Sequence, residues 1–447
     1  MKSNISTFNF TQNKCLLIKQ ERKSFIKSYD YFFQNLFSFY NINNNLVYLE
    51  IDIFENVFNE EKIEINPNIF EGLNNFKSLE KLNLKGLRFI NNFELKIYYL
   101  KEISLSFCGK ITFAENIFFN LKKLSFYDIN VNRPKSLLKF PELQECYLYN
   151  KINNIIDFKS LKNLKILELN IYDFVNFTYL EKIPLEQLKI NSDLDVTVET
   201  EKNMLEKIFL IKSLNKINLD LYNINNEEIS NINGENINVT TLNVLWKNKN
   251  NDCNIINLQK KFPNLSKLYI YISIFNNDNN GNLEIEVNKT CKIKEIILSG
   301  YGNKNIKFYC SYEYLEKLRI NLFKQINNIK DAIPIFNNKY SNEFKSLKSF
   351  EFISGNENEI TLDILKNLYS NIDKIPNLKN FKLDCIINDL DNDFYQKFIK
   401  KIIFAVNHVI LKINKKAYEK NEKYSENELK EIYSCENAKN HIIYKFK

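Results

Sequence analysis

A spaced apolar pattern recurs along most of this 447-residue chain and restricts what the chain can fold into. Its clearest copy is LKILELN, from Leu164 to Asn170: an apolar residue, two variable positions, a second apolar residue, one variable position and a third. Between Leu79 and Leu185 the copies are 21 or 22 residues apart, and later steps run from 22 to 32 residues. Periods near this length are typical of arrays in which each repeat buries its apolar face against its neighbours. The first apolar position of each copy falls at Leu46, Leu79, Leu100, Leu121, Leu143, Leu164, Leu185, Leu214, Val239, Leu265, Ile293, Leu315, Leu347, Leu378 and Val406.

The alternation within each copy predicts a β-strand, because successive side chains of a strand face opposite sides. The three apolar residues then point inward and stack on those of the next repeat. The residues between them point outward, so information about binding lies in those variable positions.

Several copies resemble the strand half of the leucine-rich repeat. They read LEKLNL at 79–84, LKKLSF at 121–126, LSKLYI at 265–270 and LEKLRI at 315–320, and lead-ins such as FKS, FPN and IPN precede the strands. The resemblance implies an α/β leucine-rich repeat solenoid: a curved parallel sheet with one strand per repeat and helices or irregular segments on its convex face. It also implies that the concave face binds a partner protein.

One family position is mostly missing. The Asn or Cys expected three positions after the third apolar residue occurs as Cys108, but Leu87, Ile129, Lys151 and Tyr172 stand there in other repeats. We therefore expect divergent and irregular repeats.

The pattern divides the chain into three parts: an N-terminal helical cap over 1–45, the solenoid over 46–413 and a C-terminal cap over 414–447. Aromatic residues at three- and four-residue steps predict an amphipathic helix over 24–40, which would cover the first repeat. Two alternatives remain for this helix: a docking element for a partner, or an F-box-like adaptor that recruits a ubiquitin ligase.

The longer repeats near the C-terminus contain helical patterns. We expect one helix over 362–372 and a second over 394–402, capped by Asp391 or Asp393. In the tail, Ser425 and Glu428 form a capping-box pattern ahead of a short helix, and a strand is expected over 441–446.

Charge and cysteine usage indicate the broad class of protein. The net charge of +8 comes almost entirely from lysines interspersed with acidic residues in this asparagine-rich chain, which favours a mixed solvated surface. Nucleic acid is therefore not expected as a partner, although a basic surface that binds RNA or an acidic membrane remains an alternative.

The 8 cysteines are widely spaced, as in reduced intracellular proteins. With no signal peptide and no membrane-spanning run visible, we expect an intracellular protein, cytoplasmic or nuclear.

One candidate binding patch combines the single tryptophan, Trp246, with Tyr269, Tyr271 and Lys267 of the next repeat. Exposed Trp and Tyr are enriched in binding hot spots. The alternative is that Trp246 lies just past its strand and turns into the core.

A second candidate patch comprises Tyr147, Tyr149 and Glu168 in the central repeats. The tyrosines would face outward on one strand, with the glutamate on the next. Cross-strand aromatic packing on a half-exposed sheet explains these residues equally well.

The sequence offers no catalytic signature. The chain has only 2 histidines, His408 and His441, and its 8 glycines form no phosphate-binding loop. We therefore expect a non-enzymatic monomer without cofactor or metal, which binds an unidentified protein partner.

Overall fold

The computed structural model describes most of the repeat array. It divides into two compact units, Met1–Asn191 (unit 1) and Ser192–Lys447 (unit 2). The described residues are 7–11, 15–19, 46–52, 64–114, 118–131, 137–149, 156–176, 179–192, 195–246, 253–254, 256–273, 282–286, 292–301, 305–309, 312–322, 344–354, 361–387, 391–414 and 422–445. The helix expected over 24–40 lies outside them.

Unit 1 is built on a parallel sheet whose strands coincide with the apolar frames. Its strands are β2 (Cys15–Lys19), β3 (Tyr48–Asp52), β5 (Lys81–Lys85), β7 (Glu102–Ser106), β9 (Lys123–Tyr127), β11 (Glu145–Leu148), β12 (Ile166–Asn170) and β13 (Gln187–Asn191). Strand β1 (Thr7–Thr11) pairs with β2 in antiparallel orientation. Because β2 already pairs with β3 in parallel, the sheet extends into residues 1–45, for which the sequence predicted only a helical cap.

A second parallel sheet stands where the sequence predicted helices or irregular segments for the early repeats. It consists of β4 (Glu64–Ile65), β6 (Arg88–Leu95), β8 (Gly109–Phe113) and β10 (Asn130–Val131). The short repeats leave little chain for a helix here, and Phe93, Leu95, Ile111 and Phe113 are buried from an extended backbone. Helical structure in unit 1 is limited to short segments: α2 (Pro67–Phe70), η2 (Glu71–Asn75), η3 (Phe158–Ser160), α3 (Ile171–Asn176) and η4 (Leu180–Lys182).

Unit 2 continues the same plan with helices between its strands. Its long parallel sheet contains β14 (Lys216–Leu221), β15 (Thr241–Trp246), β17 (Lys267–Ser273), β19 (Glu295–Tyr301), β21 (Lys317–Leu322), β22 (Ser349–Ser354), β23 (Asn380–Ile386), β24 (His408–Asn414) and β25 (His441–Ile443). A small second sheet contains β16 (Cys253–Asn254), β18 (Asn282–Glu286) and β20 (Asn305–Tyr309).

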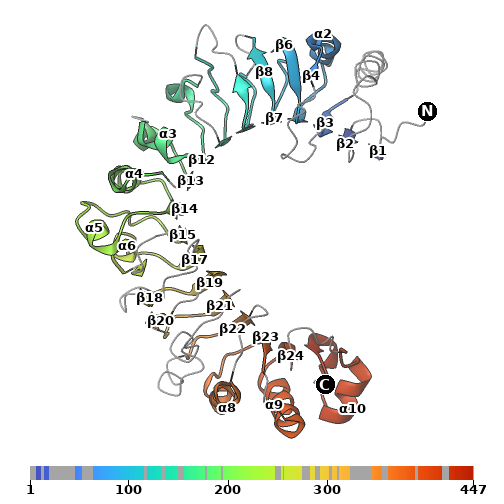
Figure 1. Ribbon diagram of the computed structural model, residues 1–447, viewed down its shortest axis with the longest axis vertical. Coiled ribbons are helices and arrows are strands. Elements are labelled where there is room, and N and C mark those ends of the chain that lie inside the picture. Colours follow the sequence, from blue (N-terminus) through green and yellow to red (C-terminus); the bar gives the residue numbers. More distant parts are fainter. Residues whose placement is uncertain are drawn as a thin grey trace. The chain divides into compact units, whose positions relative to one another are not determined.

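The described helices of unit 2 are α4 (Val198–Leu210), α5 (Asn226–Ser230), α6 (Ile256–Lys260), α8 (Leu362–Asn371), η6 (Ile372–Lys374), α9 (Asn392–Ala405), α10 (Glu426–Tyr433) and η7 (Ala438–Asn440). Five of them lie on one side of the strands of this unit: α4, α5, α6, α8 and α9 (Figure 1). Within the described residues, no helix has the length and apolar character needed to cross a bilayer.

The helices expected near the C-terminus are confirmed. Helix α9 begins at the predicted cap, where the Asp391 carboxylate accepts the Phe394 backbone N–H at 2.6 Å. Ser425 and Glu428 form the predicted capping box at the start of α10. The tail also supplies β25, which pairs in parallel with β24.

The core consists of stacked rows of apolar side chains, one residue per strand. In β12 and β13, for example, Leu167 lies opposite Leu188 and Leu169 opposite Ile190, and all four are buried. Burying a side chain of this size contributes roughly 1.5–3 kcal/mol. The α/β class and the long parallel sheet are thus as predicted.

Asparagines of the lead-ins join successive repeats. The amide Nδ2 of Asn163 donates to the Pro141 carbonyl at 2.9 Å, Asn264 donates to Ile237 at 2.8 Å, and Asn377 donates to Lys345 at 2.6 Å. This position lies directly before the first apolar residue of the frame. The asparagine that joins the repeats therefore lies before the strand, whereas the leucine-rich repeat pattern expects its Asn or Cys after the strand, where Cys108 stands.

Candidate functional site

The outward side chains of the unit 1 strands form continuous rows across one face of the sheet, which we call the open face. Strand register places Ser104 opposite Ser125, Ser125 opposite Tyr147, and Tyr147 opposite Glu168. These side chains are half-buried, apart from Glu168, which is buried. The open face therefore presents hydroxyl and aromatic groups from several strands.

Charged groups on this face are paired across strands. Lys81 lies 2.6 Å from Glu102, and Lys123 lies 3.0 Å from Glu145. Exposed pairs of this kind contribute about 0–1 kcal/mol each. They leave the middle of the open face nearly neutral, so electrostatic attraction does not dominate there.

Three aromatic rings make a strip along the open face, formed by Phe107, Tyr127 and Tyr149. The ring centroids of Phe107 and Tyr127 are 4.9 Å apart, and those of Tyr127 and Tyr149 are 5.0 Å apart. Tyr127 is 42% exposed, although it lies at the centre of the strip. Each ring therefore packs against its neighbour and still presents an edge to solvent.

Phe107 adopts a backbone conformation that disfavours a bulky residue. Its φ is 54°, and the equivalent positions one repeat away are Gly86 (φ 78°) and Asp128 (φ 46°). A large side chain in this left-handed region costs on the order of 1 kcal/mol. Backbone stability alone does not favour phenylalanine here, which points to a use for its ring.

The predicted residues Tyr147, Tyr149 and Glu168 do lie together. Tyr147 donates to the Glu145 carboxylate at 3.0 Å, and burial raises the pKa of Tyr147 to about 12, helped by this hydrogen bond. Burial also raises the pKa of Tyr149, and its hydrogen bond to Glu168 adds to the effect. Both phenols therefore stay protonated and act as donors at neutral pH.

Glu168 is held by its neighbours. It is 5% exposed, forms an ion pair with Lys189, and accepts a hydrogen bond from Asn191 at 3.1 Å. Its charge is therefore neutralised within unit 1.

The predicted exposure of Trp246 is wrong. Trp246 is 3% exposed and lies opposite Ile272, which is buried as well. Strand alternation explains the error: Leu245 and Tyr271 face outward, so the next residue of each strand faces the core. The alternative prediction of a core tryptophan is confirmed, although Trp246 is the last residue of β15 and does not lie past it.

The other members of that patch remain on the outer face of unit 2. Tyr271 is 38% exposed, and Tyr269 is half-buried beside Glu295, whose charge adds to burial in raising the Tyr269 pKa. Lys267 lies 3.9 Å from Glu295, and Lys317 lies 3.0 Å from it on the other side. Without the tryptophan, this region consists of lysine and glutamate side chains that alternate across neighbouring strands, together with two tyrosines.

Sequence reasoning missed Tyr127 and Phe107. The signal for Tyr127 was present, because it stands directly after the third apolar residue of its frame, as Tyr149 does. Phe107 belongs to a turn, and its approach to Tyr127 depends on the left-handed backbone.

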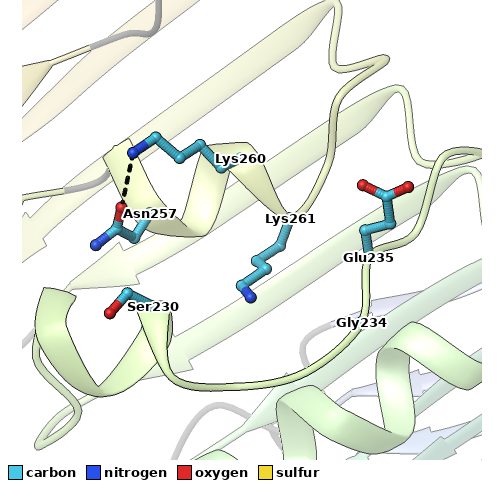
Figure 2. Close-up of a pocket in the computed structure, with 6 residues that line it drawn as sticks. All are labelled: Ser230, Gly234, Glu235, Asn257, Lys260 and Lys261. Carbon is cyan, nitrogen blue, oxygen red and sulfur yellow. Dashed lines mark hydrogen bonds between the residues drawn. The ribbon is translucent and has the colours of Figure 1, made fainter.

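A shallow pocket lies on the helix side of unit 2 (Figure 2). It is lined by Ser230, Gly234, Glu235, Asn257, Lys260 and Lys261. Three of its polar side chains donate hydrogen bonds to the local backbone or to another lining residue. Lys261 donates to the Ile232 carbonyl, Lys260 donates to Asn257 at 3.2 Å, and Ser230 donates to the Glu227 carbonyl at 2.6 Å.

A buried carboxylate in α4 has a structural role as well. Glu201 is fully buried and accepts the backbone N–H groups of Tyr222, Asn223 and Ile224 at 2.6, 3.0 and 2.6 Å. It thereby ties α4 to the turn after β14. Among the described residues, no three His, Cys, Asp or Glu side chains gather as ligands for a metal ion.

Comparison with known proteins yields a distant similarity. No protein-family model matches the chain. Among curated proteins, the chain is 25% identical to Protein Ycf2 of Physcomitrium patens over 423 residues, which cover 90% of this chain. The chain spans 15% of the length of that relative. This similarity assigns the chain to no family.

Proposed function

We propose that this chain is a non-enzymatic recognition scaffold of the leucine-rich repeat kind, which binds a partner protein on the open face of unit 1. One observation carries the proposal: the strip of Phe107, Tyr127 and Tyr149 lies beside Ser104 and Ser125 on a rigid sheet. Tyrosine with serine is the composition of antibody combining sites, where rigid rings give contact area and hydroxyls adapt to the partner.

The strip also has the energetic character of a binding site. A half-exposed tyrosine loses little conformational freedom on binding, because only two side-chain torsions are fixed. The neighbouring ion pairs already satisfy the local charges, so a partner would bury aromatic area without stripping an isolated charge. A neutral partner surface with apolar anchors suits this face best.

The wider proposal rests on repeat order and thiol state. The described frames coincide with successive parallel strands, which favours a leucine-rich repeat array. Cys15, Cys108, Cys146, Cys385 and Cys435 are unpaired thiols, as expected for an intracellular protein. Burial raises the pKa of the Cys108 thiol to about 12, which suits a packing role better than a nucleophilic one.

Affinity capture with the full chain tests the proposal. Tyr127→Ser with Tyr149→Ser should abolish retention of the proteins that the wild type captures. The matched control is Tyr179→Ser, since Tyr179 belongs to the same unit, is 38% exposed and lies in a lead-in turn away from the strip. Equal capture by all three proteins would refute recognition by the open face.

A further inference from the structure

The lead-in turns of unit 1 gather lysines that the sequence disperses. We call this surface the lead-in edge; it consists of the exposed residues just before strands β5, β7, β9 and β11. The backbone N–H of Lys101 donates to the Glu80 carbonyl at 2.7 Å, and that of Lys122 donates to the Lys101 carbonyl at 2.7 Å. Residues 21 positions apart in sequence are therefore neighbours on this edge, about one strand spacing apart.

These turns enclose a pocket of about 470 Å³, lined by Lys77, Ser78, Glu80, Tyr99, Lys101, Asn120, Lys122 and Glu142. The Lys101 ammonium is neutralised by Glu80 at 2.6 Å. Lys77 and Lys122 have no ion-pair partner in the part of the chain that the structure describes. Two ammonium groups without an ion-pair partner thus line the same pocket as Tyr99, and Glu142 is the acidic residue of this lining besides Glu80.

Exposed aromatic residues lie on two adjacent turns of the lead-in edge. Tyr99 is 58% exposed, Tyr98 is 50% exposed, and Phe119 of the next turn is 46% exposed. The Asn120 amide donates to the Tyr98 carbonyl at 3.4 Å, which places the two turns side by side. Each ring is more exposed than Tyr127 of the open face, and grouped exposed apolar surface marks an interaction site.

We propose that the lead-in edge of unit 1 binds single-stranded nucleic acid. Bases stack on Tyr99, Tyr98 and Phe119, and backbone phosphates lie against the ammonium groups of Lys77 and Lys122. Aromatic rings set among cations are the usual means of binding single strands without sequence preference. A run of acidic side chains alone would satisfy the lysines without covering the rings, whereas every nucleotide of a single strand supplies both a phosphate and a base that stacks.

Fluorescence anisotropy with a short labelled oligouridine and the full-length protein tests this proposal. Tyr99→Leu should weaken binding on the order of 10-fold, because one base loses its stacking surface. Lys77→Ala with Lys122→Ala should weaken binding and reduce the slope of log affinity against log salt by about 1.4, since each phosphate contact on a single strand contributes about 0.7.

A matched charge control comes from helix α9. Lys397→Ala with Lys400→Ala removes two exposed lysines elsewhere, so it should leave the affinity for oligouridine nearly unchanged. All substituted residues are exposed, and thermal melts should match the wild type. Equal weakening by the two lysine pairs would overturn the proposal, as would absence of binding at low salt. Polyglutamate of equal charge that competes as well as oligouridine, with no effect of Tyr99→Leu, would reassign the edge to acidic proteins and also overturn it.

Discussion

Replacing Trp246 by alanine tests whether its side chain faces the core of unit 2. An aromatic side chain of this size buries roughly 200 Å². At about 25 cal/mol per Å², that burial contributes about 5 kcal/mol. Compactness of the unfolded chain lowers the figure by up to about 40%. The Trp246 side chain is 3% exposed, so nearly all of this contribution is lost in the alanine variant.

Two further effects adjust this value. A residual cavity increases the loss, because the surrounding core relaxes only partially. The buried indole N–H has no acceptor among the described residues, so removing it returns about 1–3 kcal/mol. We therefore expect Trp246→Ala to lower the free energy of unfolding by about 3 kcal/mol, equivalent to roughly 6–12 °C in Tm for a unit of this size.

Urea unfolding followed by circular dichroism measures the loss. The control is Tyr271→Ala on the opposite face of the neighbouring strand, which should cost less than about 1 kcal/mol. Because Trp246 is the only tryptophan in the chain, its fluorescence reports burial directly: the wild type should emit at short wavelength and resist quenching by iodide. An unchanged unfolding midpoint together with efficient quenching would refute the core position.

Three other predictions concern single positions. Gly300→Ala should destabilise unit 2 by several kcal/mol in urea unfolding, because an added Cβ would lie 2.2 Å from the Ile272 carbonyl oxygen; a stable variant would contradict the strand spacing. Glu201→Ala should cost about 3 kcal/mol or more, since three buried N–H donors lose their acceptor, and Glu201→Gln should cost less; equal losses would argue against the hydrogen-bonded cradle. Burial lowers the pKa of His441, and the nearby His408 adds to the effect, so the stability of the wild type should fall as the pH drops below the unfolded-state pKa of about 6.5. His441→Leu should flatten this dependence in thermal melts from about pH 7.5 to 5. An identical pH profile for the two proteins would exclude His441 as its source.

The sequence predicts the strands well because their pattern is local. Three apolar positions in a fixed frame determine which side chains face the core, and Leu164 to Asn170 encodes β12 in this way. The caps of α9 and α10 are equally local, since Asp391 and Ser425 bond to N–H groups three residues ahead. Such features follow from a few neighbouring residues.

The candidate site depends on contacts between repeats, which a single frame does not encode. Trp246 lies two positions after Val244, the last frame position, and it faces inward because β15 continues through it. Phe107 reaches Tyr127 only through a left-handed turn. The lysines of the lead-in edge gather because 21-residue steps bring distant turns together.

The most direct test of recognition by the open face is hydroxyl-radical footprinting of the full chain with and without its captured partner. Radical labelling reports the solvent exposure of individual tyrosine rings. Tyr127 and Tyr149 should lose reactivity in the complex, whereas Tyr179, which is 38% exposed in a lead-in turn, should keep it. Unchanged labelling of Tyr127 and Tyr149 in a saturated complex would contradict recognition by the open face.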